Sequence, residues 1–158
     1  MRPDPAPSAP SVSDVADGAI RSSATTGIVG YRLRRAQLNV FQQFLTAFEQ
    51  MQLRPAEYSV LVLIDDNPGR KQTEIAEVLG IKRANLVTLV HGLEDRGLVE
   101  RIPSAADKRA NALHLTPAGD AFLARAKAIH DGLEQDIVAR LGGPEVREHL
   151  LELLDRLS

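Results

Sequence analysis

The sequence has no cysteine among its 158 residues. It therefore offers no disulfide, no thiolate ligands for zinc, no thiol nucleophile and no thiol redox sensor. It also has no apolar run approaching the roughly 18 residues of a membrane helix, and its amino terminus lacks the basic-then-apolar pattern of a signal peptide. We expect a soluble, cytoplasmic protein with no membrane partner.

Several catalytic patterns are missing as well. The chain has no Gly-rich phosphate loop, no Ser/His/Asp set with a strained turn, and no paired carboxylates outside solvated helix ends such as Asp65-Asp66. The histidines fall in separate predicted elements (His91, His114, His130 and His149), so they indicate no metal site. We expect neither an enzyme nor a protein with a cofactor.

Charge is distributed unevenly. The chain carries 19 Lys and Arg against 21 Asp and Glu, a net charge of −2. From Arg70 to Ala110 there are eight Lys and Arg against six Asp and Glu, a charge of +2, which leaves −4 for all other residues. A nucleic-acid surface, if the chain has one, is expected in this middle segment.

The first half of the sequence contains a polar tail and two predicted helices. Residues 1–26 begin with four prolines in ten residues and continue in Ser, Ala, Asp and Thr, which predicts a disordered or loosely docked tail. From Ile28 to about Gln50 a long amphipathic helix is expected, with apolar residues at three- or four-residue steps (Tyr31, Leu38, Phe41, Leu45 and Phe48). A second helix starts at Pro55 and ends before the turn Asp66-Asn67-Pro68-Gly69.

Two short helices with one glycine between them follow, in QTEIAEVLGIKRANLVTLVHGLEDRGLVER. Thr73 can cap the first helix, and Gly80 can end it in the left-handed conformation. The second helix buries its leucines and Val90, which leaves a polar face toward solvent (Arg83, Asn85, Thr88 and His91). This arrangement is typical of a helix-turn-helix.

The exposed face of the second helix has the chemistry to read a DNA major groove. Arginine pairs with guanine, asparagine pairs with adenine, and a threonine methyl contacts thymine. A simply solvated charged face is the alternative, because helix pairs with a glycine corner are common. The next residues favour DNA, since a hairpin from about Leu98 to Leu115 with the tip Asp107-Lys108-Arg109 completes a winged helix, whose Lys108 or Arg109 can reach a minor groove or a phosphate.

The last part of the chain is helical. Thr116-Pro117 supplies an N-cap and a first-turn proline, and the helix that follows lasts to Leu141. Gly142-Gly143-Pro144 starts a final helix with a leucine-rich seam. The fold class expected from the sequence is mainly α with a small β-hairpin wing.

The run LRPAEYSVLVLI, the stretch LEDRGLVER, the Asp107-Lys108-Arg109 tip and the exit LTPAG together resemble the MarR family of bacterial transcriptional regulators. The resemblance covers roughly residues 30–157. It implies a homodimeric repressor that binds pseudo-palindromic operator DNA through a winged helix-turn-helix at residues 54–116, with dimerisation helices at residues 27–53 and 117–158. Residues at matching positions are expected to contact DNA (Arg83, Asn85, Thr88, His91 and Arg109), and the charge at the hairpin tip adds Lys108.

A small-molecule effector is also expected. Arg34 lies on the apolar stripe of the first long helix, where it can clamp an anion beside aromatic walls; a salt bridge to a partner chain, or a stem that reaches water, is the alternative. The segment GYRLRRAQLNVFQQF is similar to family members that respond to aromatic acids or their coenzyme A thioesters. We expect the effector to contact Tyr31, Arg34, Arg35 and Phe41. For a thioester, Arg32, Arg34 and Arg35 would meet the nucleotide phosphates.

The competing interpretation is a winged helix that contacts only protein. Such a surface would expose more apolar area, whereas Arg83, Asn85 and Arg109 are charged or polar. The sequence gives neither the operator sequence nor the regulated genes.

Overall fold

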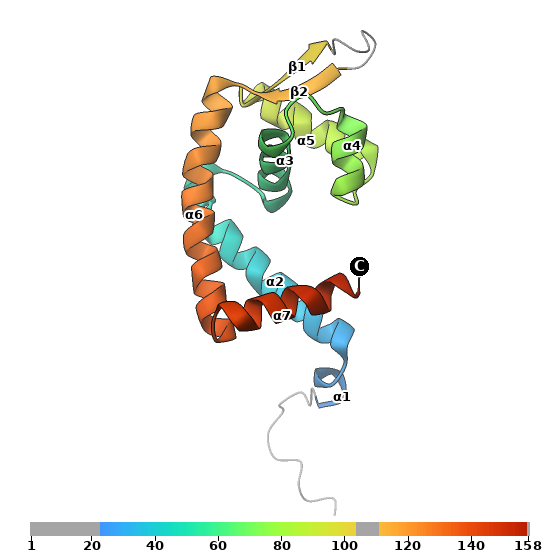
Figure 1. Cartoon of the computed structure of the whole chain (residues 1–158), viewed down its shortest axis with the longest axis vertical. Helices are drawn as coiled ribbons and strands as arrows, with labels where there is room; N and C mark the ends of the chain where they lie inside the picture. The colour runs from blue at the N-terminus through green and yellow to red at the C-terminus, as the bar shows by residue number, and fades with distance from the viewer. Residues whose placement is uncertain (1–22, 104–110, 158) are drawn as a thin grey trace, which may run out of the picture. The chain divides into compact units, whose positions relative to one another are not determined.

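The computed structural model describes residues 23–103 and 111–157. Along the chain these fall into two compact units, the first ending at Gln37 and the second beginning at Leu38. Figure 1 shows helices α1 to α7 and a two-stranded hairpin. The prediction for residues 1–22 lies outside the described residues. Residues 23–26, assigned to the tail from the sequence, instead form the short helix α1 (Ser23–Thr26).

The long first helix is confirmed as α2 (Val29–Ala47), which is followed by a 3-10 turn, η1 (Glu49–Met51). In the first unit its side chains are exposed, apart from a half-buried Tyr31. In the second unit, Phe44 and Phe48 are buried, whereas Leu38 and Phe41 are about half exposed. The buried edge of the helix is therefore formed by Phe44 and Phe48 rather than by the whole predicted stripe.

Three helices build the body of the second unit: α3 (Pro55–Asp66), α4 (Gln72–Val78) and α5 (Arg83–Asp95). Pro55 occupies the first turn of α3, as predicted, where its missing N–H costs nothing. The Glu57 carboxylate accepts the Arg54 backbone N–H at 2.8 Å and satisfies one of the unpaired amides at the helix start.

The hairpin consists of β1 (Val99–Pro103) and β2 (Asn111–Leu115), paired antiparallel from Val99 opposite Leu115 to Pro103 opposite Asn111. The other edge of β2 is also used, because Lys71 forms a bridge with Ala112 and Leu113 exchanges backbone hydrogen bonds with Gly69 and Arg70. The wing is thereby attached directly to the segment that leads into α4.

Helix α6 (Pro117–Leu141) begins at a capped end, as the sequence predicted. The Thr116 hydroxyl accepts the Gly119 N–H at 3.0 Å and donates to the Gly97 carbonyl at 2.6 Å. Helix α7 (Pro144–Asp155) follows a glycine corner and is tied back to α6 by an ion pair of 2.9 Å between Arg147 and Glu134. Lys127 joins α6 to Asp65 of α3 at 2.6 Å.

The core lies where α3, α5, α6, the hairpin and the end of α2 meet. Its least exposed large side chains come from all of these elements (Phe48, Leu61, Ile64, Leu86, Leu93, Leu113 and Leu123). Every fully buried side chain in the described ranges is apolar. The predicted fold class, mainly helical with a small β-hairpin wing, is confirmed.

Helix α6 approaches the start of the hairpin very closely at Gly119. A Cβ built on Gly119 would lie 2.0 Å from the Leu98 carbonyl oxygen, so only glycine fits there. This contact fixes the hairpin to the first turn of α6. Across the described ranges, no helix is both long enough and apolar enough to cross a membrane.

Candidate nucleic-acid interface

The first helix of the helix-turn-helix is capped by a glutamate. The Glu74 carboxylate accepts the Lys71 backbone N–H at 2.8 Å and pairs with Arg70 at 3.2 Å. These contacts lower the pKa of Glu74, chiefly through the backbone hydrogen bond. The prediction that Thr73 caps the helix is wrong, because the N-cap is Lys71, two residues earlier, and α4 begins at Gln72.

The corner between α4 and α5 is built as the sequence predicted. Gly80 has a φ of 62°, in the left-handed region that other residues enter at a cost. The Ile81 N–H then donates to the Ala76 carbonyl at 3.1 Å, which closes the end of α4. Ala76 is only 4% exposed, consistent with a small residue where two helices cross.

Helix α5 turns one face to the core and the other to solvent. Leu86, Val90 and Leu93 are completely buried. The four residues predicted to contact DNA are all exposed (Arg83, Asn85, Thr88 and His91). We call α5 the recognition helix from here on. All four lie on the solvent side of α5, and their contact with DNA stays a prediction.

Two of these side chains already interact within the helix. The Thr88 hydroxyl donates to the Ala84 carbonyl at 3.2 Å, so its methyl group and its remaining lone pairs are left for a ligand. The Nδ1 atom of His91 lies 3.7 Å from a carboxylate oxygen of Glu94. The Thr88 hydroxyl is thus held toward its own helix, whereas His91 and Glu94 are close without a hydrogen bond between them.

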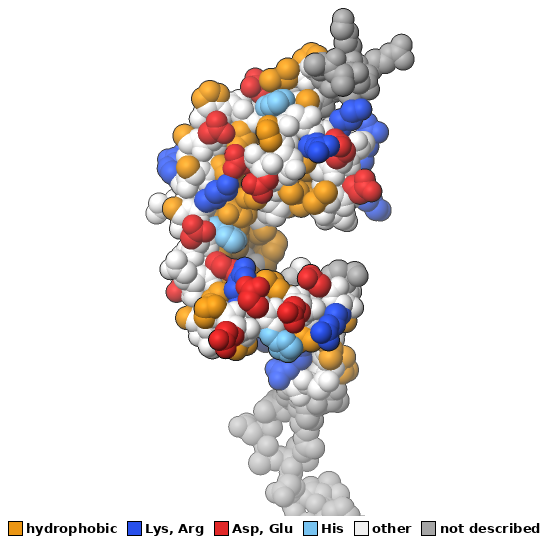
Figure 2. Space-filling view, viewed as in Figure 1, with side chains coloured by type: hydrophobic (Ala, Val, Ile, Leu, Met, Phe, Trp, Pro, Cys, Tyr) orange, Lys and Arg blue, Asp and Glu red, His pale blue; other side chains and the backbone are white. Residues whose placement is uncertain are grey.

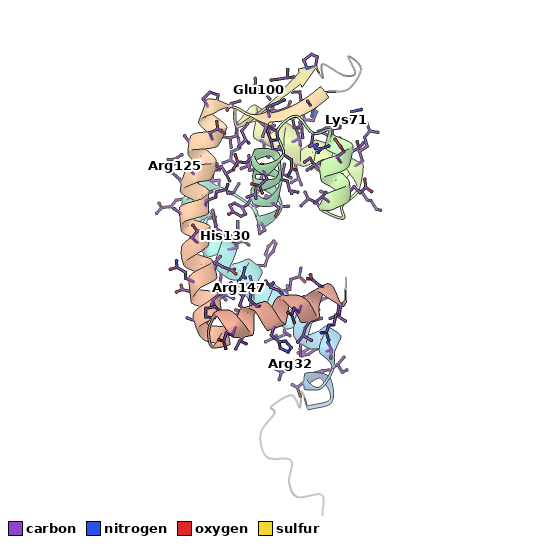
Figure 3. All side chains as sticks on the ribbon, viewed as in Figure 1. Arg32, Lys71, Glu100, Arg125, His130 and Arg147 are labelled. Atoms are coloured by element: carbon purple, nitrogen blue, oxygen red, sulfur yellow. The ribbon has the colours of Figure 1, made fainter. Side chains whose placement is uncertain are left out.

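The wing presents its two strands beside the recognition helix. Figure 3 shows Lys71 close to β2, at the start of α4, in agreement with its bridge to Ala112. Arg101 of β1 reaches Glu94 of the recognition helix at 3.1 Å. Lys108 and Arg109, the predicted wing contacts, lie outside the described residues.

The surface around α4 has both signs of charge. Figure 2 shows Lys and Arg side chains interspersed with Asp and Glu there. Arg70, Lys71, Lys82 and Arg83 are all exposed near the two ends of α4 and the start of α5. Cations at the edge of the exposed face are suited to phosphate contacts, which position a protein on DNA without reading its sequence.

Sequence reasoning missed an aromatic cluster at the junction of α2, α3 and α6. Tyr58 stacks on His130 with ring centroids 4.7 Å apart, and Phe44 stacks on Phe48 at 4.1 Å. Burial raises the pKa of Tyr58, and Asp131 raises it further while Lys127 opposes this. Figure 3 shows His130 on α6. Helical spacing alone could place Phe44 and Phe48 on one face, but not next to His130, which lies over 80 residues later in the chain.

The four residues predicted to bind an effector all lie on α2. Arg34, Arg35 and Phe41 are exposed and Tyr31 is half-buried. Among the described residues, no ion pair or hydrogen bond engages the guanidinium groups of Arg34 and Arg35. In the same ranges, no group of three or more His, Cys, Asp or Glu residues could hold a metal ion.

The comparisons with known proteins agree with this geometry. The MarR family model matches residues 51–110, which run from the end of η1 to the wing. The transcriptional repressor CouR, solved with a 23-mer DNA duplex, is 44% identical, with a TM-score of 0.82 over 88% of this chain and 98% of that chain. CouR bound to p-coumaroyl-CoA is 42% identical, with a TM-score of 0.78 over 88% of this chain and 97% of that chain.

A curated relative supports the same assignment. A Thauera aromatica protein assigned to transcriptional regulation of the hcr operon is 37% identical over 149 residues, which are 94% of this chain and 88% of that protein. This identity extends well beyond the helix-turn-helix. The prediction of a regulator rather than an enzyme is therefore confirmed: the chain belongs to the MarR family of transcriptional regulators.

Proposed function

We propose that this MarR-family regulator is a repressor that binds a pseudo-palindromic operator as a homodimer and is released by an aromatic acid or its coenzyme A thioester. The observation that carries the proposal is the exposed face of the recognition helix, on which Arg83, Asn85, Thr88 and His91 all face solvent. Such a helix enters a major groove and places these groups against base edges. CouR, bound to a DNA duplex, supports this proposal.

The wing supplies the second set of contacts in the proposal. In the described part of the wing, β1 and β2 pair antiparallel as far as Pro103 opposite Asn111. Lys108 and Arg109 in that segment are proposed to contact the minor groove or a phosphate. Contacts of this kind fix the register of the recognition helix on the duplex.

The homodimer is proposed from the exposed apolar side chains of α7 and of α2. These residues are 38–65% exposed, and the last of them lies just after α7 (Leu33, Leu38, Val40, Phe41, Val146, Leu151, Leu153 and Leu157). Exposed apolar side chains grouped on one helix are suited to a protein interface. Two-fold symmetry then places two recognition helices in successive major grooves, about 34–36 Å apart.

The effector is proposed to contact Tyr31, Arg34, Arg35 and Phe41 of α2. A carboxylate or phosphate would pair with the guanidinium groups, and an aromatic ring would pack on Tyr31 or on Phe41. The description of CouR as bound to p-coumaroyl-CoA supports the thioester class. An effector that binds more tightly to a conformation with a different spacing of the recognition helices weakens operator binding. The loss of operator affinity is no larger than the ratio of the effector's affinities for that conformation and for the DNA-binding one.

The test is a fluorescence anisotropy titration with duplexes from the DNA that flanks the protein's own gene. We expect one duplex to bind selectively over random-sequence DNA, and an aromatic acid or its thioester to release it. Arg83→Ala and Arg109→Ala should each abolish selective binding while the protein stays folded. Selective binding that survives both changes would show that the assigned residues are wrong.

The effector part needs its own control. Arg34→Gln should weaken release by the effector and leave operator affinity unchanged, because Arg34 is not among the residues proposed to contact DNA. Lys127→Gln is a matched control, since it removes a cation that is already paired with Asp65. Equal release of wild type and Arg34→Gln across the titration would remove Arg34 from the site.

A further inference from the structure

Glu94, in the last turn of the recognition helix, lies between two side chains from different parts of the interface. Its Oε2 atom is 3.1 Å from Nη2 of Arg101 on β1. The same oxygen is 3.7 Å from Nδ1 of His91, one turn earlier on the recognition helix. A single carboxylate oxygen therefore joins the wing strand to the exposed face of the recognition helix.

Arg101 holds this carboxylate in place. The side chains of Arg101 and Glu94 are only 24% and 23% exposed. Nε and Nη2 of Arg101 are shielded from solvent and have no aligned hydrogen bond within the described ranges. The pair is thus held by charge attraction rather than by an aligned hydrogen bond. A shielded guanidinium without its counter-charge would be costly, so Glu94 has little freedom to turn away.

His91, unlike Glu94 and Arg101, is exposed to solvent. Its side chain is 61% exposed and lies on the solvent side of the recognition helix, as Arg83, Asn85 and Thr88 do. A carboxylate beside Nδ1 favours the ring form that carries its proton on Nδ1. In that form Nε2 is a hydrogen-bond acceptor, which matches the amino groups that adenine and cytosine present in the major groove.

We propose that Glu94 is a positioning residue of the DNA interface. Held by Arg101, it sets the ring orientation and the tautomer of His91, and through His91 it determines which base the protein prefers at that position. The inference rests on the proposed operator binding. It predicts a loss of selectivity that simple electrostatics does not, because removing a negative charge near DNA strengthens binding to every duplex alike.

The first experiment compares Glu94→Gln with Asp95→Asn. Both changes remove one negative charge from the end of the recognition helix, but the exposed Asp95 carboxylate has no ion pair or hydrogen bond in the part of the chain that the structure describes. Affinities for the operator and for a random-sequence duplex are measured by anisotropy. Glu94→Gln should lower the ratio of the two affinities about tenfold, the size of one good base contact, while Asp95→Asn leaves it unchanged.

A second variant separates positioning from mere charge compensation. The double variant Glu94→Gln with Arg101→Gln removes both shielded charges, so it relieves any cost of leaving Arg101 unpaired. We expect the selectivity ratio to stay low, because His91 still lacks its carboxylate. Recovery of wild-type selectivity in this double variant would overturn the proposal.

The His91 ring gives a readout without DNA. Nitrogen-15 NMR of the imidazole, assigned with His91→Ala, should report the Nδ1–H form in wild type and a shift toward the Nε2–H form in Glu94→Gln. An unchanged tautomer would overturn the inference. If wild type binds no duplex selectively, the proposed function fails, and the NMR result still decides whether Glu94 positions His91.

Discussion

At the scale of single residues, the interface depends on side chains that do different work. Arg83 can pair with a base edge, whereas Lys71, exposed beside β2, is placed for a phosphate. Base contacts carry sequence discrimination and phosphate contacts carry salt dependence. The two roles can therefore be told apart by measuring affinity against sequence and against salt.

Asn85→Ala should lower operator affinity by about 1–3 kcal/mol and relax selectivity at one base pair. Lys71→Gln should weaken binding to all duplexes and reduce the slope of log affinity against log salt by about one. Titrations at several salt concentrations, on the operator and on single-base variants of it, measure both effects. A change of salt slope in Asn85→Ala, with selectivity intact, would make Asn85 a phosphate contact and contradict its role in base reading.

Glu74 makes the start of α4 sensitive to acid. Its pKa is lowered in the folded protein, first by the Lys71 N–H and then by Arg70. A lowered folded pKa means that the stabilisation is complete above the unfolded value, about 4.3, and is lost as the pH falls through the folded pKa. Wild type should therefore be more stable than Glu74→Gln at neutral pH.

The stability difference between wild type and Glu74→Gln should shrink as the pH falls below about 4. Thermal midpoints measured from pH 7 to pH 3 follow this change. Glu77→Gln is the matched control on the same helix, because among the described residues the exposed Glu77 carboxylate has no hydrogen bond or ion pair. A difference between wild type and Glu74→Gln that is constant with pH would contradict the role of the charge.

At the scale of elements, the sequence was sufficient wherever local chemistry fixes a boundary. Pro55, Gly80 and the Thr116-Pro117 pair mark helix ends where the structure has them. Helix α2 was harder, because its apolar residues cover more than one face. Periodicity cannot say which face packs on the same chain, so burial of Phe44 and Phe48 with exposure of Phe41 was not predictable.

The interface was predictable to a similar degree. The exposed face of the recognition helix follows from helical spacing and is confirmed as exposed. The contact between Glu94 and Arg101 was not foreseen, because it crosses the turn at Gly97 and depends on how β1 leaves the helix. Thr73 was misassigned as a cap because a glutamate carboxylate meets the Lys71 amide instead.

The junction of β1 with α6 provides an element-scale prediction. Gly119→Ala would place a Cβ 2.0 Å from the Leu98 carbonyl oxygen and should lower the free energy of unfolding by about 1–3 kcal/mol. Gly132→Ala, in the same helix with nothing within 4 Å of the new Cβ, should raise it by about 0.5–1 kcal/mol. Urea denaturation measures both, and effects of the same sign would contradict the close approach.

At the scale of the whole molecule, the proposed operator binding requires two copies of the chain. One recognition helix reads one half-site, and selectivity for a pseudo-palindrome arises when two are linked at fixed spacing. Disrupting the dimer should therefore weaken operator binding without altering any residue of the interface. The exposed leucines of α7 are the place to do this.

Leu153→Glu should shift the chain toward monomer, because a carboxylate in an apolar interface is costly unless it is paired. Leu153 is 41% exposed. The control is Val78→Glu, which introduces the same side chain on α4, outside the proposed interface, where Val78 is 70% exposed. Sedimentation equilibrium should show a rise of at least about tenfold in the dimer dissociation constant for Leu153→Glu alone, since 1.4 kcal/mol corresponds to a factor of ten. Operator affinity at low protein concentration should fall with it, and should recover as the concentration is raised. A Leu153→Glu protein that stays dimeric would place the interface elsewhere, and a monomer with full operator affinity would contradict paired half-site binding.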